Sequence, residues 1–184
     1  NNLSDAASSA ITYLGFRLSE KPADREHPYG HARFEYLSGL TVAAMIVICG
    51  FELAKSSFEK ILNPTAVVLS YVTVLVLAGS VLVKLFMMIF YNKTGRKIQS
   101  TTLFAAAADS RNDCITTSAV LLTILAEHFL DVRIDGIVGT AVSVFIIYSG
   151  VSLAKKTISP LLGEGADPEL KKQLVDYIKL QPLI

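Results

Sequence analysis

The segment from Val67 to Tyr91 reads VVLSYVTVLVLAGSVLVKLFMMIFY, and it decides the fold class of this protein. A helix needs about 20 mostly apolar residues to cross about 30 Å of hydrocarbon, because each residue adds about 1.5 Å. The segment is long enough, and Lys84 is its one charged residue. A lysine near the end of such a helix can extend its ammonium group towards the lipid headgroups. The segment therefore predicts a transmembrane helix.

Four further segments have a similar apolar character. Ile137 to Ala154 carries no charge, Leu37 to Leu53 carries Glu52 near its end, and Thr101 to Ala126 carries charges inside it. The opening residues, from Asn1 to Leu18, are small and apolar after a polar start. We therefore predict an all-α, polytopic transmembrane bundle in which five membrane helices are visible.

The composition excludes several classes of protein. The 184 residues are 52% hydrophobic and 18% charged, and their mean hydropathy is +0.48. A formal net charge of +1 provides no electrostatic footprint for nucleic acid. We find no nucleophile beside a base and no nucleotide-binding loop, so we do not expect an enzyme. Cys49 and Cys114 lie in apolar segments without metal-ligand spacing, which favours packing roles.

The domain boundary is predicted near Gly163. Residues 1–162 form the transmembrane domain, and residues 163–184 begin a cytoplasmic C-terminal domain. Gly163 and Gly165 interrupt the last apolar segment, and Asp167-Pro168 is typical of the start of a new helix. The loops rich in Lys and Arg, including 17–33 and 93–97, are assigned to the cytoplasm. We expect a multi-pass protein of the cell (inner) membrane with a cytoplasmic C-terminus.

Two carboxylates lie inside the fourth apolar segment. Asp109 and Asp113 are four residues apart, so a helix places them on one face, one turn apart. Each costs about 2.5–3.5 kcal/mol near the bilayer centre, so their charge must be compensated. A divalent cation would compensate it, and Asn1 and Asp5 repeat the spacing on the opening helix.

Structural alternatives remain for both pairs. The two aspartates could instead form ion pairs with Lys84 or Arg111. Arg111, however, follows Asp109 by two residues and faces away from it on a helix. Asn1 and Asp5 could cap a helix at the membrane surface.

The ligand atoms of these side chains indicate which kind of cation they would bind. A set of amide and carboxylate oxygens without His or Cys favours Mn²⁺, Mg²⁺ or Ca²⁺ over Zn²⁺ or Cu⁺. Carboxylates must lose their protons to bind a metal, so metal and protons compete for such a site. This competition is the chemical basis of exchange transport.

The chain resembles the cation diffusion facilitators, six-helix exporters of divalent metals that are coupled to protons. The resemblance covers nearly the whole chain, and three motifs carry it: NNLSD at 1–5, HPYGHARFE at 27–35 and ADSRND at 108–113. It implies that the first family helix precedes Asn1. It also implies a transport site formed by Asn1, Asp5, Asp109 and Asp113. An Asn/Asp pair with an Asp/Asp pair resembles the manganese-exporting branch, whereas His at position 109 would resemble zinc or iron exporters.

The resemblance implies a second metal site in the loop, where Asp24, His27 and His31 match the motif. Two imidazoles and a carboxylate suit Zn²⁺ or Mn²⁺, although a hydrated loop with turn-forming histidines is the alternative. The family also forms homodimers through a salt bridge. Arg33 fits its basic partner, but Gly163 occupies the acidic position and Glu164 follows.

The predicted function is export of a divalent metal cation from the cytoplasm in exchange for protons. Mn²⁺ is the preferred substrate, and Zn²⁺ or Fe²⁺ are the alternatives within the family. A passive cation channel lined by the same carboxylates and a non-transporting membrane scaffold are the other interpretations. The expected partners are the metal ion, protons, the lipid bilayer and a second copy of the chain. No prosthetic group and no nucleic acid are expected.

Overall fold

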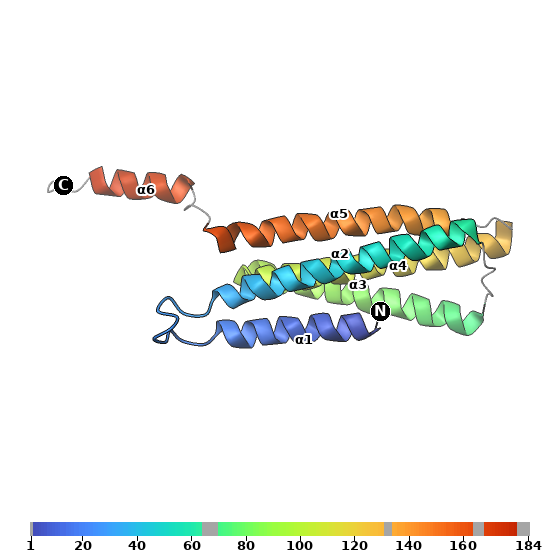
Figure 1. Ribbon diagram of the computed structural model, residues 1–184, viewed down its shortest axis with the longest axis horizontal. Coiled ribbons are helices and arrows are strands. Elements are labelled where there is room, and N and C mark those ends of the chain that lie inside the picture. Colours follow the sequence, from blue (N-terminus) through green and yellow to red (C-terminus); the bar gives the residue numbers. More distant parts are fainter. Residues whose placement is uncertain (1, 64–69, 131–133, 164–167, 180–184) are drawn as a thin grey trace.

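The computed structural model describes residues 2–63, 70–130, 134–163 and 168–179. For residues 2–5, 130, 168 and 170 it describes only the helical backbone. Over these ranges all regular secondary structure is α-helical, as predicted, and five long helices run along one common axis (Figure 1). The helices are α1 (Asn2–Ser19), α2 (Arg33–Leu62), α3 (Tyr71–Ile98), α4 (Thr101–Leu130), α5 (Asp135–Leu162) and α6 (Pro168–Lys179).

Helices α2 and α5 form the most closely packed pair of the bundle. They run antiparallel, and Gly50 on α2 lies against Ile146 and Ile147, whereas Gly150 on α5 lies against Ile46 and Val47. A Cβ atom added to Gly150 would lie 3.1 Å from the backbone nitrogen of Val47. Glycines let two helix backbones approach closely, which is how helices pack in membranes without a hydrophobic driving force.

The other helices pack around this pair. Helix α4 contacts all of α1, α2, α3 and α5, whereas α3 packs against α4 alone among the described helices. The core where α2, α4 and α5 meet is formed by Val42, Ile46, Ala105 and Ile146. Helix α4 is therefore the element that connects the two sides of the bundle.

Helix ends follow local rules. Gln99 ends α3 in the left-handed conformation, with φ of 54°, and the Ser100 hydroxyl accepts a hydrogen bond from the Leu103 N–H at the start of α4. Gly163, with φ of 92°, ends α5, as the sequence predicted. Helix α6 begins at Pro168, also as predicted, and contacts none of the other described helices.

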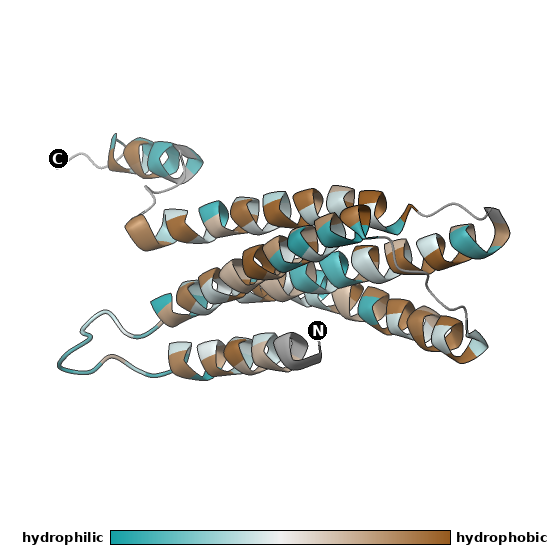
Figure 2. Cartoon of the chain, turned by 45° about the vertical axis from the view of Figure 1, so that its right-hand side comes forward, coloured by the Kyte–Doolittle hydropathy of each residue, from teal (hydrophilic) through white to brown (hydrophobic). Residues whose placement is uncertain are grey.

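Three described helices, α2, α3 and α5, are long and apolar enough to cross a membrane. Many of their large apolar side chains are exposed, and hydrophobic residues, coloured brown, recur along these helices in Figure 2. Helix α4 is 30 residues long and packs beside them, but it carries the charges at 109–113. The predicted helix 67–91 and the observed helix α3 have different bounds. Residues 67–69 lie outside the described ranges, and α3 continues beyond Tyr91 to Ile98. Lys84 consequently lies at the midpoint of α3 and not near its end.

The close contact between α2 and α5 leads to a prediction about stability. Gly150→Ala adds a methyl group against the stiff side chains and the backbone of 46–47, so it should lower the free energy of unfolding by about 1–3 kcal/mol. Gly79→Ala is the matched control, because a Cβ there meets nothing within 4 Å. That change should be neutral or stabilising by up to about 1 kcal/mol. Thermal unfolding of the full-length protein, followed by circular dichroism in detergent, measures both. Equal melting temperatures for the two variants would contradict this packing.

Candidate functional site

Three ligand-type side chains converge in the loop between α1 and α2. One ligand atom each from Asp24, His27 and His31 lies within 4.8 Å of the others. The Nδ1 atom of His27 lies 3.2 Å from Asp24 Oδ1, and Nε2 of His31 lies 3.6 Å from Asp24 Oδ2. The loop therefore brings together the three residues that the sequence motif singled out.

Backbone hydrogen bonds shape this loop around Asp24. Its Oδ1 atom accepts the N–H groups of Glu26, at 3.0 Å, and of His27, at 2.6 Å. The hydrogen bond from the His27 N–H is the main cause that lowers the pKa of the Asp24 carboxyl below its usual value. Gly30 then turns the chain with φ of 79°, a conformation that glycine adopts without strain. The carboxylate is thus ionised at neutral pH and can act as a ligand.

The two histidines have different surroundings. His31 is 9% exposed, and its Nδ1 atom lies 3.2 Å from the carbonyl oxygen of Pro22. In metal sites a hydrogen bond of this kind fixes the imidazole so that the other nitrogen faces the ion. His27 is exposed and its ring lies 4.5 Å from that of His31. Two imidazoles and a carboxylate at these separations can hold Zn²⁺ or Mn²⁺.

The second candidate cluster lies within the bundle on α4. Asp109 and Asp113 both line a cavity of about 250 Å³ between α2, α4 and α5, which we call the α2 cavity. Asp109 also lines a cavity of about 160 Å³ between α1, α3 and α4, which we call the α1 cavity. The helical spacing therefore places both carboxylates on one face, as predicted.

Asp113 has a cationic partner that the sequence suggested only as an alternative. The ammonium group of Lys84 on α3 donates to Asp113 Oδ2 at 2.6 Å, and the two side chains are 16% and 25% exposed. A charge inside a membrane is costly unless it is compensated, and this contact compensates the lysine at the midpoint of α3. A divalent cation that uses Asp113 as a ligand has to compete with Lys84.

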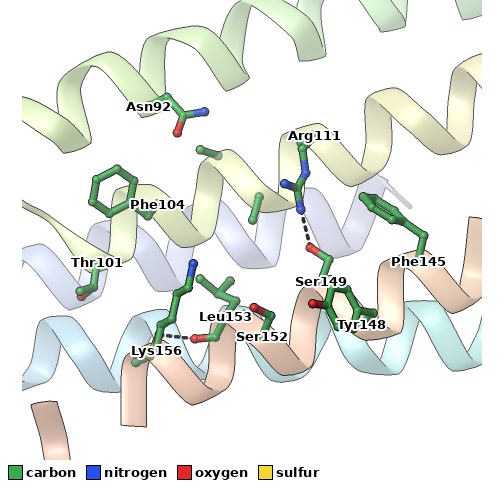
Figure 3. Close-up of a pocket in the computed structure, with 13 residues that line it drawn as sticks. Asn92, Thr101, Phe104, Arg111, Phe145, Tyr148, Ser149, Ser152, Leu153 and Lys156 are labelled. Atoms are coloured by element: carbon green, nitrogen blue, oxygen red, sulfur yellow. Dashed lines mark hydrogen bonds between the residues drawn. The ribbon is translucent and has the colours of Figure 1, made fainter. Parts of the chain in front are cut away.

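Arg111 belongs to a different surface. It lines a cavity of about 560 Å³ between α3, α4 and α5, whose lining includes neither aspartate, and it donates to the Ser149 hydroxyl at 2.6 Å (Figure 3). Its guanidinium also lies 5.5 Å from the centre of the Phe145 ring. The sequence-based conclusion that Arg111 does not share the face of Asp109 is consistent with these contacts.

The structure does not describe the side chains of Asn1 and Asp5, the other two residues of the predicted transport site. Asn1 lies outside the described residues, and for Asp5 only the helical backbone is described. Glu164, the acid considered for a dimer salt bridge, also lies outside them. The four-residue set with Asn1 and Asp5 therefore stays a prediction.

Two residues that line the α2 cavity were not predicted as site residues from the sequence. Asn112 and Glu52 line the α2 cavity together with the two aspartates. Asn112 directly precedes Asp113 and is three residues from Asp109, a spacing that would have placed it near the same face. Glu52 could not have been found, because only the packing of α2 against α4 brings it to this cavity.

Comparison with known proteins identifies the relatives of this chain. Residues 1–162 match the family model of the cation efflux transmembrane domain. An uncharacterized transporter of Methanocaldococcus jannaschii is 29% identical over 176 residues, which cover 96% of this chain and 62% of the relative. The manganese efflux system protein MneS of Bacillus subtilis is 27% identical over 167 residues, or 91% of this chain and 57% of MneS. The cation-efflux pump FieF of Shewanella oneidensis is 24% identical over 184 residues, or 100% of this chain and 62% of FieF. The chain thus spans less than two thirds of the length of these relatives.

The loop cluster leads to a prediction about pH. Protons and metal compete for the same ligand atoms, so Zn²⁺ binding at the loop should weaken as the pH falls. Asp24 does not cause this loss: its lowered pKa means that its contribution to loop stability persists above the ordinary carboxyl value and disappears only at lower pH. Competition with a chelating dye at several pH values, in the Asp109→Ala/Asp113→Ala background, measures the affinity.

Matched histidine variants test the assignment of this site. His31→Ala should raise the dissociation constant for Zn²⁺ at pH 7 at least ten-fold, because it removes a ligand whose orientation is fixed. His128→Ala changes a histidine in the last turn of α4 and should have no effect. An unchanged affinity in His31→Ala would show that the loop is a turn and not a metal site.

Proposed function

This chain belongs to the cation efflux family, and from that premise we propose that it exports a divalent metal cation across a membrane in exchange for protons. The family consists of transporters and not of enzymes, and the chain is a multi-pass membrane protein. The metal enters from the side of the basic loops and binds Asp109 and Asp113 together with Asn1 and Asp5. The observation that carries the proposal is the pair of carboxylates that line cavities inside an apolar bundle.

The ion pair between Lys84 and Asp113 fits this mechanism. A buried carboxylate needs a compensating positive charge at every stage of a transport cycle. Lys84 compensates Asp113 when no metal is bound, and a divalent cation that binds Asp113 replaces this compensation. Exchange of the metal for protons at the same oxygens keeps the charge of the site nearly constant. The helix pair α3 and α4 can then remain packed throughout the cycle.

Mn²⁺ is the proposed substrate. The proposed ligands are all oxygens, which favours hard cations, and one relative is named a manganese efflux protein. Another is named a cation-efflux pump without a metal, so Zn²⁺ and Fe²⁺ remain the alternatives. The loop cluster of Asp24, His27 and His31 is proposed as a second metal site at the membrane edge. A homodimer is proposed from the family resemblance, with the transmembrane domain ending at residue 162 and a cytoplasmic domain following.

Removal of either aspartate should abolish transport. In full-length protein reconstituted into vesicles, Asp109→Ala and Asp113→Ala should each reduce Mn²⁺ uptake to the level of protein-free vesicles, because the remaining ligands cannot offset the dehydration of the ion. A metal-sensitive dye inside the vesicles reports the uptake, and thermal unfolding confirms that the variants fold. Transport by either variant at the wild-type rate would contradict the assignment.

Two controls separate the alternative functions. If the carboxylate of Asp113 only pairs with Lys84 to hold the bundle together, the neutral double variant Lys84→Met/Asp113→Asn should transport normally. Under our proposal it should remain inactive. A passive channel would conduct when the pH gradient is collapsed, whereas an exchanger should stop.

The choice of metal depends on ligand hardness at position 109. Asp109→His replaces a carboxylate oxygen by an imidazole nitrogen, which favours Zn²⁺ over Mn²⁺. The ratio of Zn²⁺ to Mn²⁺ transport should therefore rise at least ten-fold, as measured with both ions in the same vesicles. An unchanged ratio would refute the argument from ligand type.

A further inference from the structure

The cavity of about 560 Å³ between α3, α4 and α5, which we call the α5 cavity, has neither of the two aspartates in its lining. Its volume lies within the range of about 300–1,000 Å³ that is typical of small-molecule sites. Helices α3 and α5 each pack against α4 but make no contact with each other. Helix α4 therefore forms the floor of the cavity, and no contact between α3 and α5 closes the side opposite to it.

Two cationic side chains extend into the α5 cavity from opposite sides. Arg111 comes from α4 and Lys156 from α5, and Figure 3 shows each side chain directed towards the other helix. The described contacts of Arg111 are with the Ser149 hydroxyl and the Phe145 ring, which are both uncharged. Among the described residues, neither cation forms an ion pair with a carboxylate. The described part of the chain therefore leaves two positive charges in this cavity without a counter-charge.

Arg111 lies at a depth where such a charge is costly. Helix α4 has 30 residues, so it is about 45 Å long and, if centred, extends about 7.5 Å beyond a hydrocarbon layer of about 30 Å at each end. Arg111 lies about 15 Å from the start of α4 at Thr101, which is about 7.5 Å inside the hydrocarbon. Helical side chains point towards the helix N-terminus, and for α4 this is the end that carries the basic loops. The guanidinium therefore extends back towards the headgroups at that end, and Lys156 lies near the same end because α5 ends there at Leu162.

The mouth of the α5 cavity is aromatic. Phe145 and Tyr148 both line the cavity, and they are 40% and 72% exposed. They belong to α5, which with α3 is long and apolar enough to cross a membrane, so a mouth between these two helices faces lipid. A ligand that matches both features has an anionic group for the cations and an apolar part for the aromatic mouth. A phospholipid has both, whereas a freely soluble anion has only the first.

We propose that the α5 cavity binds the headgroup of an anionic phospholipid from the leaflet on the side of the basic loops. The lipid phosphate supplies the counter-charge for Arg111 and Lys156, the Ser152 hydroxyl donates to a headgroup oxygen, and an acyl chain leaves the cavity past Phe145 and Tyr148. Basic pockets between transmembrane helices on the cytoplasmic side are a known type of site for such lipids. The bound lipid bridges α4 and α5. This inference goes beyond the proposed export function and does not depend on it.

Lipid titration of the full-length protein in detergent tests the proposal, with native mass spectrometry counting the bound lipids. Wild-type protein should bind dioleoylphosphatidylglycerol at least five-fold more tightly than dioleoylphosphatidylcholine. Lys156→Gln should reduce this preference to less than two-fold, because it removes one of the two cations. Lys155→Gln is the matched control, since Lys155 is the exposed neighbour outside the cavity lining, and it should keep the preference. An equal loss in both variants would show that the lipid responds to surface charge and would overturn the site.

A pair of steric variants tests whether the cavity itself holds the headgroup. Ser152→Trp fills the cavity and leaves both cations in place, so it should weaken phosphatidylglycerol binding at least five-fold. Ser159→Trp is its control, because Ser159 is exposed on the same helix and does not line the cavity. Wild-type affinity in Ser152→Trp would contradict the proposal. Circular dichroism of both variants confirms that they fold.

Two further outcomes would overturn the proposal. If millimolar glycerol 3-phosphate displaces phosphatidylglycerol from wild-type protein, the cavity is a site for soluble phosphates and not for a lipid. If wild-type protein binds the two lipids equally, another segment of the full-length protein or a second copy covers the cavity. All titrations are made without Mn²⁺, so their results stand apart from those of the transport experiments. A protein that fails to export a metal but prefers phosphatidylglycerol would refute the proposed function and support the lipid site.

Discussion

The compensation of carboxylate charge inside an apolar bundle is the constraint on which the rest of this structure depends. Asp109 and Asp113 lie on a helix that contacts every other long helix, and Lys84 reaches Asp113 from the midpoint of α3. Hydrocarbon cannot solvate these charges, so each must be offset by another charge or face a hydrated cavity. The close packing of α3 on α4 and the cavities around Asp109 are the two ways in which the bundle meets this requirement.

The bundle combines a closely packed pair of helices, α2 and α5, with a helix that carries charged residues, α4. Glycines let α2 and α5 approach each other closely, so that this pair can act as a firm support. Helix α4 packs against that pair with small residues and carries the two aspartates that line the cavities. On its other side it contacts α1 and α3.

The loop cluster and the bundle cluster differ in chemistry in a way that suits different tasks. Asp24, His27 and His31 combine nitrogen and oxygen ligands at an exposed loop, where an ion can bind and leave without crossing hydrocarbon. The two aspartates of the bundle offer carboxylate oxygens and line cavities between the helices.

The sequence by itself determined the elements and the residue types of the candidate sites. Apolar segments of membrane length, the i, i+4 spacing of Asp109 and Asp113, and the stop at Gly163 all follow from local rules that need no knowledge of neighbouring helices. The tertiary structure decided which residues meet. Lys84 was expected to reach the membrane surface, yet it pairs with Asp113 because α3 extends to Ile98 and packs along α4. Glu52 joins the aspartates because α2 packs beside α4, and contacts between distant segments depend on helix register, which no single segment encodes.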